Sequence, residues 1–269
     1  MVGMERKTKY YVASLSGGKD SLAMVLLLIA SGYPLTHVVF YDGGMEFSCI
    51  YRIIEKIRPI IENYGVKLIV LKPEREFWLD MFIKPINEGT EKEHFGYDWC
   101  GGKCRWKTSD KISAINKFLD SLDGGYTQYI GIAADEPSRI KEEKGKIYPL
   151  KDWGLTERDC LNYCWQYGWH WWEKSTDDIG YIDLYSILDR VSCWCCANKN
   201  IKELRNIYHY LPTYWGYLKG MQSRIDRPFH GGVSIFDYEK RFKLEDAQMV
   251  FDFCKTEPSL MTVKVLERM

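Results

Sequence analysis

A short polar loop near the N-terminus carries the residues best suited to binding phosphate. It follows an apolar run at 10–15, expected to be a strand, and precedes a segment at 20–31 with the pattern of a helix. Glycines in such a loop leave backbone N–H groups exposed, and the positive end of the helix dipole attracts anions. A lysine adds a full charge, and two serines add hydroxyl groups. The sequence therefore predicts a phosphate site at Ser16, Gly17, Gly18, Lys19, Asp20 and Ser21.

The acidic residue of this loop needs its own explanation, because the carboxylate of Asp20 repels phosphate. It is explained if Mg²⁺ bridges Asp20 to the phosphates, or if Asp20 caps the helix. The loop is not a Walker A loop, which has four residues between its glycines and ends in Lys-Ser or Lys-Thr. An ordinary strand-to-helix turn is the alternative. The complete set of loop residues between the first strand and helix favours a functional site.

The elements around the loop alternate between strand and helix. Apolar runs at 37–41, 66–71 and 129–133 predict further strands, and helical spacing or context predicts helices at 50–64 and 108–122. This alternation predicts a doubly wound α/β fold with a mostly parallel sheet over residues 1–155. The remaining residues, 156–269, are rich in Trp and Tyr and are expected to form a helical C-terminal region whose first helix is capped by Thr156.

Composition indicates a globular protein with no whole-molecule attraction to nucleic acid or membrane. Of the 269 residues, 46% are apolar and 28% charged, and the formal net charge is zero. The longest apolar stretch, 22–30, is too short to cross a bilayer, and the N-terminus does not have the pattern of a signal peptide. Nine cysteines in such a chain predict thiol, metal or redox chemistry in the cytoplasm rather than a disulfide framework.

Two groups of cysteines have the spacing of a metal site. Cys100 and Cys104 form the first group, and Cys193 and Cys196 belong to the second. Two close pairs that are separated in the sequence commonly build a four-ligand site, and thiolates suit either Zn²⁺ or an iron–sulfur cluster. The alternative is that these are small buried thiols. Cys195 is not needed for a four-ligand site. The other four cysteines are interpreted as buried thiols: Cys49, Cys160, Cys164 and Cys254.

The loop at 16–21 resembles the signature of the PP-loop superfamily of ATP pyrophosphatases, which has the adenine nucleotide alpha hydrolase-like fold. Three later segments resemble, in order, elements of the phosphoadenosine phosphosulfate (PAPS) reductase-like family. Residues 41–47 resemble its Asp-Thr-Gly-x-Glu-Phe element, 131–139 its Gly-x-Arg-x-x-Glu-Ser-x-x-Arg element, and 148–153 its Pro-Leu-x-Asp-Trp element. The resemblance covers residues 10–200.

This resemblance implies an adenine nucleotide bound across the carboxyl ends of the strands. It implies catalytic or Mg²⁺-binding roles for Lys19, Asp20 and Asp135. Besides the loop, it implies nucleotide contacts from Asp42, Gly43, Gly131 and Arg139. The expected reaction is cleavage of ATP to AMP and pyrophosphate, which adenylates an acceptor that a sulfur donor protein or thiol then attacks.

Two departures from the sulfonucleotide reductases bear on the reaction. The loop keeps Gly-Gly-Lys-Asp, which those enzymes usually lose, and the sequence has no C-terminal Glu-Cys-Gly-x-His element. Both departures favour ATP-dependent adenylation. An adenylyl-sulfate or phosphoadenylyl-sulfate reductase is the first alternative, and a non-catalytic nucleotide-binding module is the second.

The cysteine order also resembles the [4Fe–4S] ligands of the adenylyl-sulfate reductase branch. Here the first pair is spaced by three residues instead of being adjacent, so Zn²⁺ stays as an alternative. A nucleic-acid acceptor and a homodimer are further expectations, and no membrane partner is expected. Four tryptophans could stack on bases of such an acceptor, although packing is the favoured interpretation: Trp165, Trp169, Trp171 and Trp172.

Overall fold

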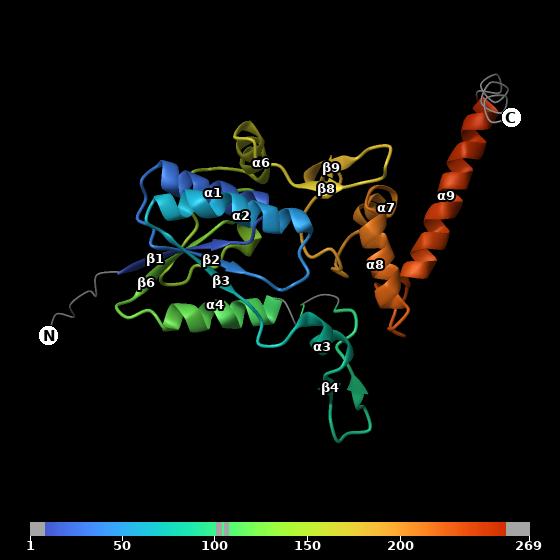
Figure 1. The fold of residues 1–269 in the computed structure, drawn as a ribbon, viewed down its shortest axis with the longest axis horizontal. Coiled ribbons are helices and arrows are strands. Elements are labelled where there is room, and N and C mark those ends of the chain that lie inside the picture. The colour runs from blue at the N-terminus through green and yellow to red at the C-terminus, as the bar shows by residue number, and fades with distance from the viewer. Residues whose placement is uncertain (1–8, 101–103, 105–107, 257–269) are drawn as a thin grey trace.

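The computed structural model describes residues 9–100, 104 and 108–256, with side chains described up to residue 249. Five parallel strands form the central sheet (Figure 1). Their order is β3 (Lys67–Leu71), β2 (His37–Tyr41), β1 (Tyr10–Leu15), β6 (Tyr126–Ile130) and β7 (Lys146–Ile147). The predicted doubly wound α/β fold is therefore confirmed. The fourth expected strand begins and ends three residues earlier than predicted, because the chain turns at Gly131, where the N–H of Ile132 donates to the carbonyl of Ile130.

Helices cover both faces of this sheet. The helices α1 (Lys19–Ala30) and α2 (Ser48–Asn63) lie on one face and α4 (Asp110–Asp120) on the other (Figure 1). The isoleucines predicted to form the apolar side of α2 are all buried. Strand β1 alternates between the two layers: Val12 packs with residues of α4, whereas Ala13 and Leu15 belong to the larger core. Strand β2 is buried at every position, which explains its almost continuously apolar sequence.

The chain after β7 returns to the phosphate-loop side of the sheet. The short helix α5 (Pro149–Asp152) leads to α6 (Glu157–Gln166), which packs along α1. A capping box confirms the predicted helix start, because the Thr156 hydroxyl accepts from the N–H of Asp159 and the Asp159 carboxylate accepts from the N–H of Thr156. One apolar core joins residues on both sides of position 155, so the proposed division into two domains stays a prediction.

The C-terminal half contains a hairpin as well as helices, which the sequence analysis did not predict. The strands β8 (Trp172–Lys174) and β9 (Tyr181–Asp183) pair antiparallel and are followed by the turn η3 (Leu184–Ser186). The helices α7 (Ile201–Tyr210), α8 (Pro212–Gln222) and α9 (Ile235–Thr256) come next. Strands of three residues are too short to give a period-2 signal.

Smaller elements complete the described chain. A segment between β3 and α4 contains α3 (Phe77–Phe82) and the two-stranded pair β4 (Pro85–Ile86) and β5 (His94–Phe95). The turn η2 (Pro137–Arg139) follows β6. Within the described part of the chain, no helix combines the length and apolar character needed to cross a bilayer.

Gly131 allows β6 to end directly against the first turn of α1. A methyl group added at Gly131 would lie 2.9 Å from the Cα of Ser21 and 3.1 Å from its backbone nitrogen. These are backbone atoms of the phosphate loop, so they cannot rotate away. Gly131 therefore acts through packing, by letting the loop and the sheet edge approach each other.

We expect Gly131→Ala to lower the free energy of unfolding by about 1–3 kcal/mol, the usual cost of overpacking. Urea denaturation followed by circular dichroism measures this change. Gly216→Ala is the matched control, because Gly216 lies in α8 with nothing within 4 Å of the added methyl group. That control should leave stability unchanged or raise it. Equal effects of the two substitutions would contradict the packing role of Gly131.

Candidate active site

The phosphate loop connects β1 to α1 and is held in shape by its own serines. Gly17 has a φ of +79°, and a side chain there would meet Ile50 Cγ2 at 2.8 Å, so only glycine fits. The Ser21 hydroxyl accepts from the N–H of Ser16 at 3.0 Å and donates to the carbonyl of Gly18 at 3.1 Å. These contacts close the loop on itself without any ligand, and the two serine hydroxyls lie 2.9 Å apart.

Side chains from the C-terminal half hold the loop from outside. Trp171 donates from Nε1 to the carbonyl of Gly17 at 2.8 Å, and the N–H of Lys19 donates to the Tyr185 hydroxyl at 2.9 Å. Burial raises the pKa of Tyr185 well above its ordinary value of 10, so its hydroxyl stays neutral. Tyr185 was not predicted as a functional residue, because it follows a hairpin that was not predicted either.

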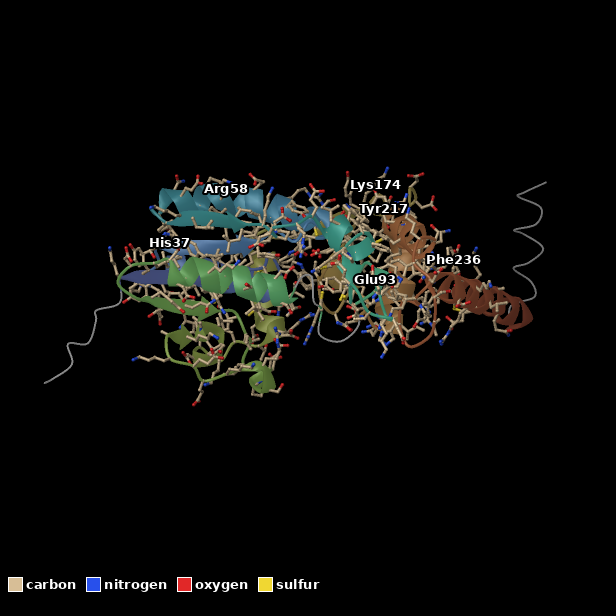
Figure 2. The ribbon with its side chains drawn as sticks, turned by 90° about the horizontal axis from the view of Figure 1, so that it is seen from below. His37, Arg58, Glu93, Lys174, Tyr217 and Phe236 are labelled. Atoms are coloured by element: carbon tan, nitrogen blue, oxygen red, sulfur yellow. The ribbon has the colours of Figure 1, made fainter. Side chains whose placement is uncertain are left out.

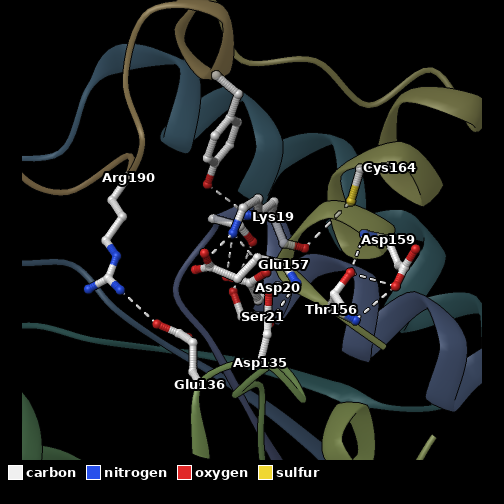
Figure 3. Close-up of polar contacts among 12 residues, drawn as sticks. Lys19, Asp20, Ser21, Asp135, Glu136, Thr156, Glu157, Asp159, Cys164 and Arg190 are labelled. Atoms are coloured by element: carbon white, nitrogen blue, oxygen red, sulfur yellow. Dashed lines mark hydrogen bonds and ion pairs between the residues drawn. The ribbon is translucent and has the colours of Figure 1, made fainter. Parts of the chain in front are cut away.

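Lys19 is almost fully buried and lies among carboxylates. Its Nζ is 3.0 Å from both oxygens of Asp20 and 3.2 Å from Oε1 of Glu157, which is the first residue of α6 (Figure 3). Glu136 completes a group of three carboxylates whose ligand atoms lie within 4.8 Å of one another. Oxygen ligands in this number and spacing suit a hard divalent cation such as Mg²⁺.

The environment of these three carboxylates disfavours negative charge on Asp20. Burial raises the pKa of Asp20 above its ordinary value of 3.8, and the nearby Glu157 and Glu136 raise it further, although Lys19 opposes both effects. Glu136 in turn contacts two arginines. Arg139 contacts it through Nη1, and Arg190 Nη2 lies 2.7 Å from Oε1 of Glu136. Figure 3 shows the contact with Arg190. Acidic and basic side chains thus lie together beside the phosphate loop.

The structure gives Asp135, predicted to bind Mg²⁺, a supporting position. Asp135 Oδ1 accepts from the N–H of Glu157 at 3.0 Å and so helps to fix the start of α6 (Figure 3). The neighbouring Glu136, not Asp135, belongs to the carboxylate group. The catalytic role of Asp135 stays a prediction. Glu157 was not predicted, because acidic residues are common in the first turn of any helix.

Asp42 and Gly43 follow β2 at the carboxyl edge of the sheet, the same edge as the loop. Asp42 Oδ1 accepts from the N–H of Gly44 at 2.8 Å and from the Tyr51 hydroxyl at 2.9 Å. Its own N–H donates to the carbonyl of Leu71 at the end of β3. These bonds give the segment a fixed shape next to the crevice in which open α/β sheets bind ligands.

The two cysteine groups approach a common segment of the C-terminal half. Trp99, next to Cys100, packs its ring 4.7 Å from that of Phe229. The adjacent His230 contacts the carbonyl of Ala197, next to Cys196, at 2.8 Å. The described cysteines form no disulfide, and the group of carboxylates with metal-binding geometry includes none of them. A four-cysteine metal site therefore stays a prediction.

The cysteines assigned to packing behave as such where they are described. Cys49, Cys160 and Cys164 are buried, and burial raises the pKa of all three, that of Cys160 to about 12. Cys164 also donates to the carbonyl of Lys19 at 3.5 Å. The side chain of Cys254 lies outside the described residues.

Comparison with known proteins identifies the family. Residues 10–169 match the phosphoadenosine phosphosulfate reductase domain. The chain belongs to this family. All residues of the loop, the segment after β2 and the carboxylate group fall within the matched range, so the resemblance inferred from the motifs is confirmed.

Individual relatives are distant. The chain is 24% identical to the uncharacterized protein MJ0066 of Methanocaldococcus jannaschii over 78% of its length and 41% of that protein. It is 27% identical to the nin region protein ORF290 of Escherichia phage lambda, over 62% of this chain and 60% of the relative. It is 25% identical to the tRNA-specific 2-thiouridylase MnmA 1 of Bacteroides fragilis, over 76% of this chain and 60% of the relative.

The chain thus spans 41–60% of the length of these curated relatives. Among solved structures, the U34-tRNA thiolase NcsA from Methanococcus maripaludis, with its [4Fe–4S] cluster, aligns at a TM-score of 0.35 and 19% identity. That alignment covers 61% of this chain and 59% of the thiolase.

The raised pKa of Asp20 leads to a prediction about stability. A carboxyl group whose pKa is higher in the folded state lowers stability as the pH rises through that pKa, and the cost is fully present at neutral pH. We therefore expect Asp20→Asn to raise the free energy of unfolding of the nucleotide-free protein at neutral pH and to weaken its dependence on acid pH. Urea denaturation at a series of pH values measures both effects.

Asp159→Asn is the control of opposite sign. The Thr156 hydroxyl and N–H lower the pKa of Asp159. The Asp159 carboxylate therefore stabilises the fold at neutral pH, and this stabilisation is lost as the pH falls. That variant should be less stable than the parent at neutral pH. A matching loss of stability in Asp20→Asn would show that Asp20 serves the fold rather than a ligand.

Proposed function

We propose that this protein is an enzyme that cleaves ATP to AMP and pyrophosphate and adenylates an acceptor for sulfur transfer. The observation that carries the proposal is the buried Lys19 in a complete phosphate loop, facing carboxylates from α1, α6 and the turn after β6. The three acids are matched by Lys19 and by the two arginines on Glu136. A divalent cation bound by the carboxylates would release these basic groups to contact the phosphates of a nucleotide.

The geometry supports a division of labour within the site. The loop backbone and the Lys19 ammonium would hold the leaving pyrophosphate, because they place positive charge where negative charge develops. Mg²⁺ bound with ATP would neutralise phosphate charge, and Asp20, Glu136 and Glu157 offer it oxygen ligands. Lys19 would exchange its contact with Glu157 for one with the phosphates.

Arginines and the Asp42 segment would bind the remainder of the nucleotide. Arg139 and Arg190 both contact Glu136, so they border the carboxylate group and could hold the α-phosphate as it is attacked. Asp42 and Gly43 would lie at the ribose or base, in accord with their place at the carboxyl edge of the sheet.

ATP cleavage tests the proposal through its products. Incubation with Mg²⁺ and ATP should yield AMP and pyrophosphate, because water attacks the α-phosphorus in place of the acceptor and pyrophosphate leaves. Lys19→Ala should slow their formation by at least about 100-fold, as for loss of one electrostatic contact to a transition state. Lys240→Ala is the matched control, because Lys240 is exposed on α9. Formation of ADP and phosphate would contradict the proposal. Tight binding of adenylyl sulfate without ATP cleavage would support a reductase instead.

We further propose that Cys100, Cys104, Cys193 and Cys196 hold a [4Fe–4S] cluster, with Zn²⁺ as the alternative. The donor set fits such a group, because thiolates are the usual ligands of iron–sulfur clusters and the segments of the four cysteines approach one another near Phe229 and His230. A bound cluster would carry sulfur or stabilise the fold. We also propose that the protein is cytoplasmic, that a donor protein or thiol supplies the sulfur, and that the protein forms a homodimer.

Metal content tests this second proposal. Protein purified without oxygen should contain about four iron atoms and four sulfides per chain by the definition of the cluster, and Cys196→Ser should lose them. Cys195→Ala, which changes the neighbouring thiol, should retain them. Zinc in place of iron would select the alternative ion. Unchanged metal content in Cys196→Ser would overturn the ligand assignment.

A further inference from the structure

The hairpin β8–β9 has one inner and one outer face. The inner face carries Glu173, which is buried, accepts from the N–H of Cys49 and bonds the Tyr214 hydroxyl at 3.2 Å. Side chains alternate along a strand, so Trp172 and Lys174 lie on the outer face, as does Tyr181, the register partner of Lys174. All three outer residues are exposed.

Three rings form a stack that ends at the surface. The ring of Trp165 lies 6.4 Å from that of His170 at an interplanar angle of 21°, and His170 lies 5.2 Å from Trp172 at 29°. Trp172 ends the stack and is 47% exposed. Tyr181 beside it is 66% exposed, so two aromatic side chains of the outer face are open to a partner.

One buried carboxylate fixes the orientation of the stack. Asp183 Oδ2 accepts from Trp165 Nε1 at 3.1 Å and contacts His170 Nδ1 at 3.0 Å. Its other oxygen accepts from the N–H of Tyr185 at 3.0 Å. The rings are therefore held in place before any partner binds, which lowers the entropic cost of stacking on them.

Cations surround the rings. Arg158 lies 5.9 Å from the centre of the Trp165 ring, and Lys174 is exposed on the same outer face. Arg52 donates to the carbonyl of Trp172 and pairs with the buried Glu173, whose Oε1 lies 3.5 Å from Arg52 Nη2. The carboxylates of Glu173 and Asp183 are buried, so they offer no repulsion at this surface. Exposed acids occur in the hairpin turn at 177–178, beyond the paired residues. Figure 2 shows Lys174 at the surface of the molecule, on the half that holds the C-terminal helices.

The stack is joined to the phosphate loop by neighbouring residues. Trp171 bonds the loop at Gly17, whereas Trp172, the next residue, points to the surface. Asp183 holds the rings and also bonds Tyr185, which accepts from the N–H of Lys19. A partner stacked on Trp172 would thus be positioned relative to the loop through short, buried connections.

We infer that the outer face of β8–β9 binds an unpaired base of an RNA, with Trp172 and Tyr181 as stacking surfaces and Lys174 and Arg158 facing its phosphates. Open aromatic faces interspersed with cations are the arrangement that recognises single-stranded nucleic acid. The name of one curated relative, a tRNA-specific 2-thiouridylase, accords with RNA.

One part of this inference rests on the proposed function, namely that the bound RNA is the acceptor that is adenylated. Of the tryptophans considered from the sequence, Trp169 and Trp171 are buried, as the packing interpretation expected. Trp172 is the one whose exposure departs from that interpretation.

Binding of an unstructured 20-nucleotide RNA, labelled with fluorescein and measured by anisotropy without ATP, tests the inference. Trp172→Ala should weaken binding by about 5- to 150-fold, corresponding to the loss of one base–aromatic stack. Trp172→Phe should restore much of the affinity because it keeps an aromatic face. Trp78→Ala is the matched control, since Trp78 is 45% exposed and also stacks on a neighbouring ring, and it should leave affinity unchanged.

Other outcomes overturn the assignment. Equal affinity for DNA of the same sequence, or equal loss in Trp78→Ala, would contradict an RNA site on this face. No RNA binding together with intact formation of AMP would reject this inference and leave the proposed function standing. RNA binding without any ATP cleavage would retain the site and reject the function. The circular dichroism spectrum and urea midpoint of Trp172→Ala should match those of the parent protein, which shows that the variant is folded.

Discussion

The backbone of the phosphate loop is fixed by two rings from the other half of the chain. Trp171 bonds the carbonyl of Gly17 and Tyr185 accepts the N–H of Lys19, across more than 150 residues of sequence. A loop of glycines has large conformational freedom, and buried bonds to aromatic side chains remove it. The hairpin, the turn after it and α6 are all arranged around this contact.

A second constraint follows from burying charge beside that loop. Lys19 pairs with Asp20 and Glu157, and two arginines contact Glu136, yet burial still raises the pKa of Asp20. Taking such groups out of water is unfavourable unless a ligand compensates them. Strain of this kind is typical of functional sites. The carboxylate group and the arginines around Glu136 are therefore best understood as a site that is completed by a nucleotide and its cation.

Local patterns predicted much of the fold, and long-range contacts explain what they did not predict. The spacing of isoleucines in α2, the strand–loop–helix order and the cap at Thr156 are properties of neighbouring residues, and all are confirmed. Glu136 and Glu157 join Asp20 only through the packing of α6 on α1, which no local pattern encodes. Likewise, Trp171 is buried against the loop whereas Trp172, the first residue of β8, is exposed, and no local pattern distinguishes these two adjacent tryptophans.

The central claim is that this loop binds the pyrophosphate end of ATP, and competition calorimetry tests it most directly. Pyrophosphate with Mg²⁺ would be titrated into the protein alone and into protein saturated with α,β-methylene ATP, a non-cleavable analogue. The account predicts binding to the free protein, loss of that binding in the saturated sample, and weaker binding after Glu136→Gln. Simultaneous binding of both ligands, or displacement of the analogue by adenylyl sulfate but not by pyrophosphate, would contradict it.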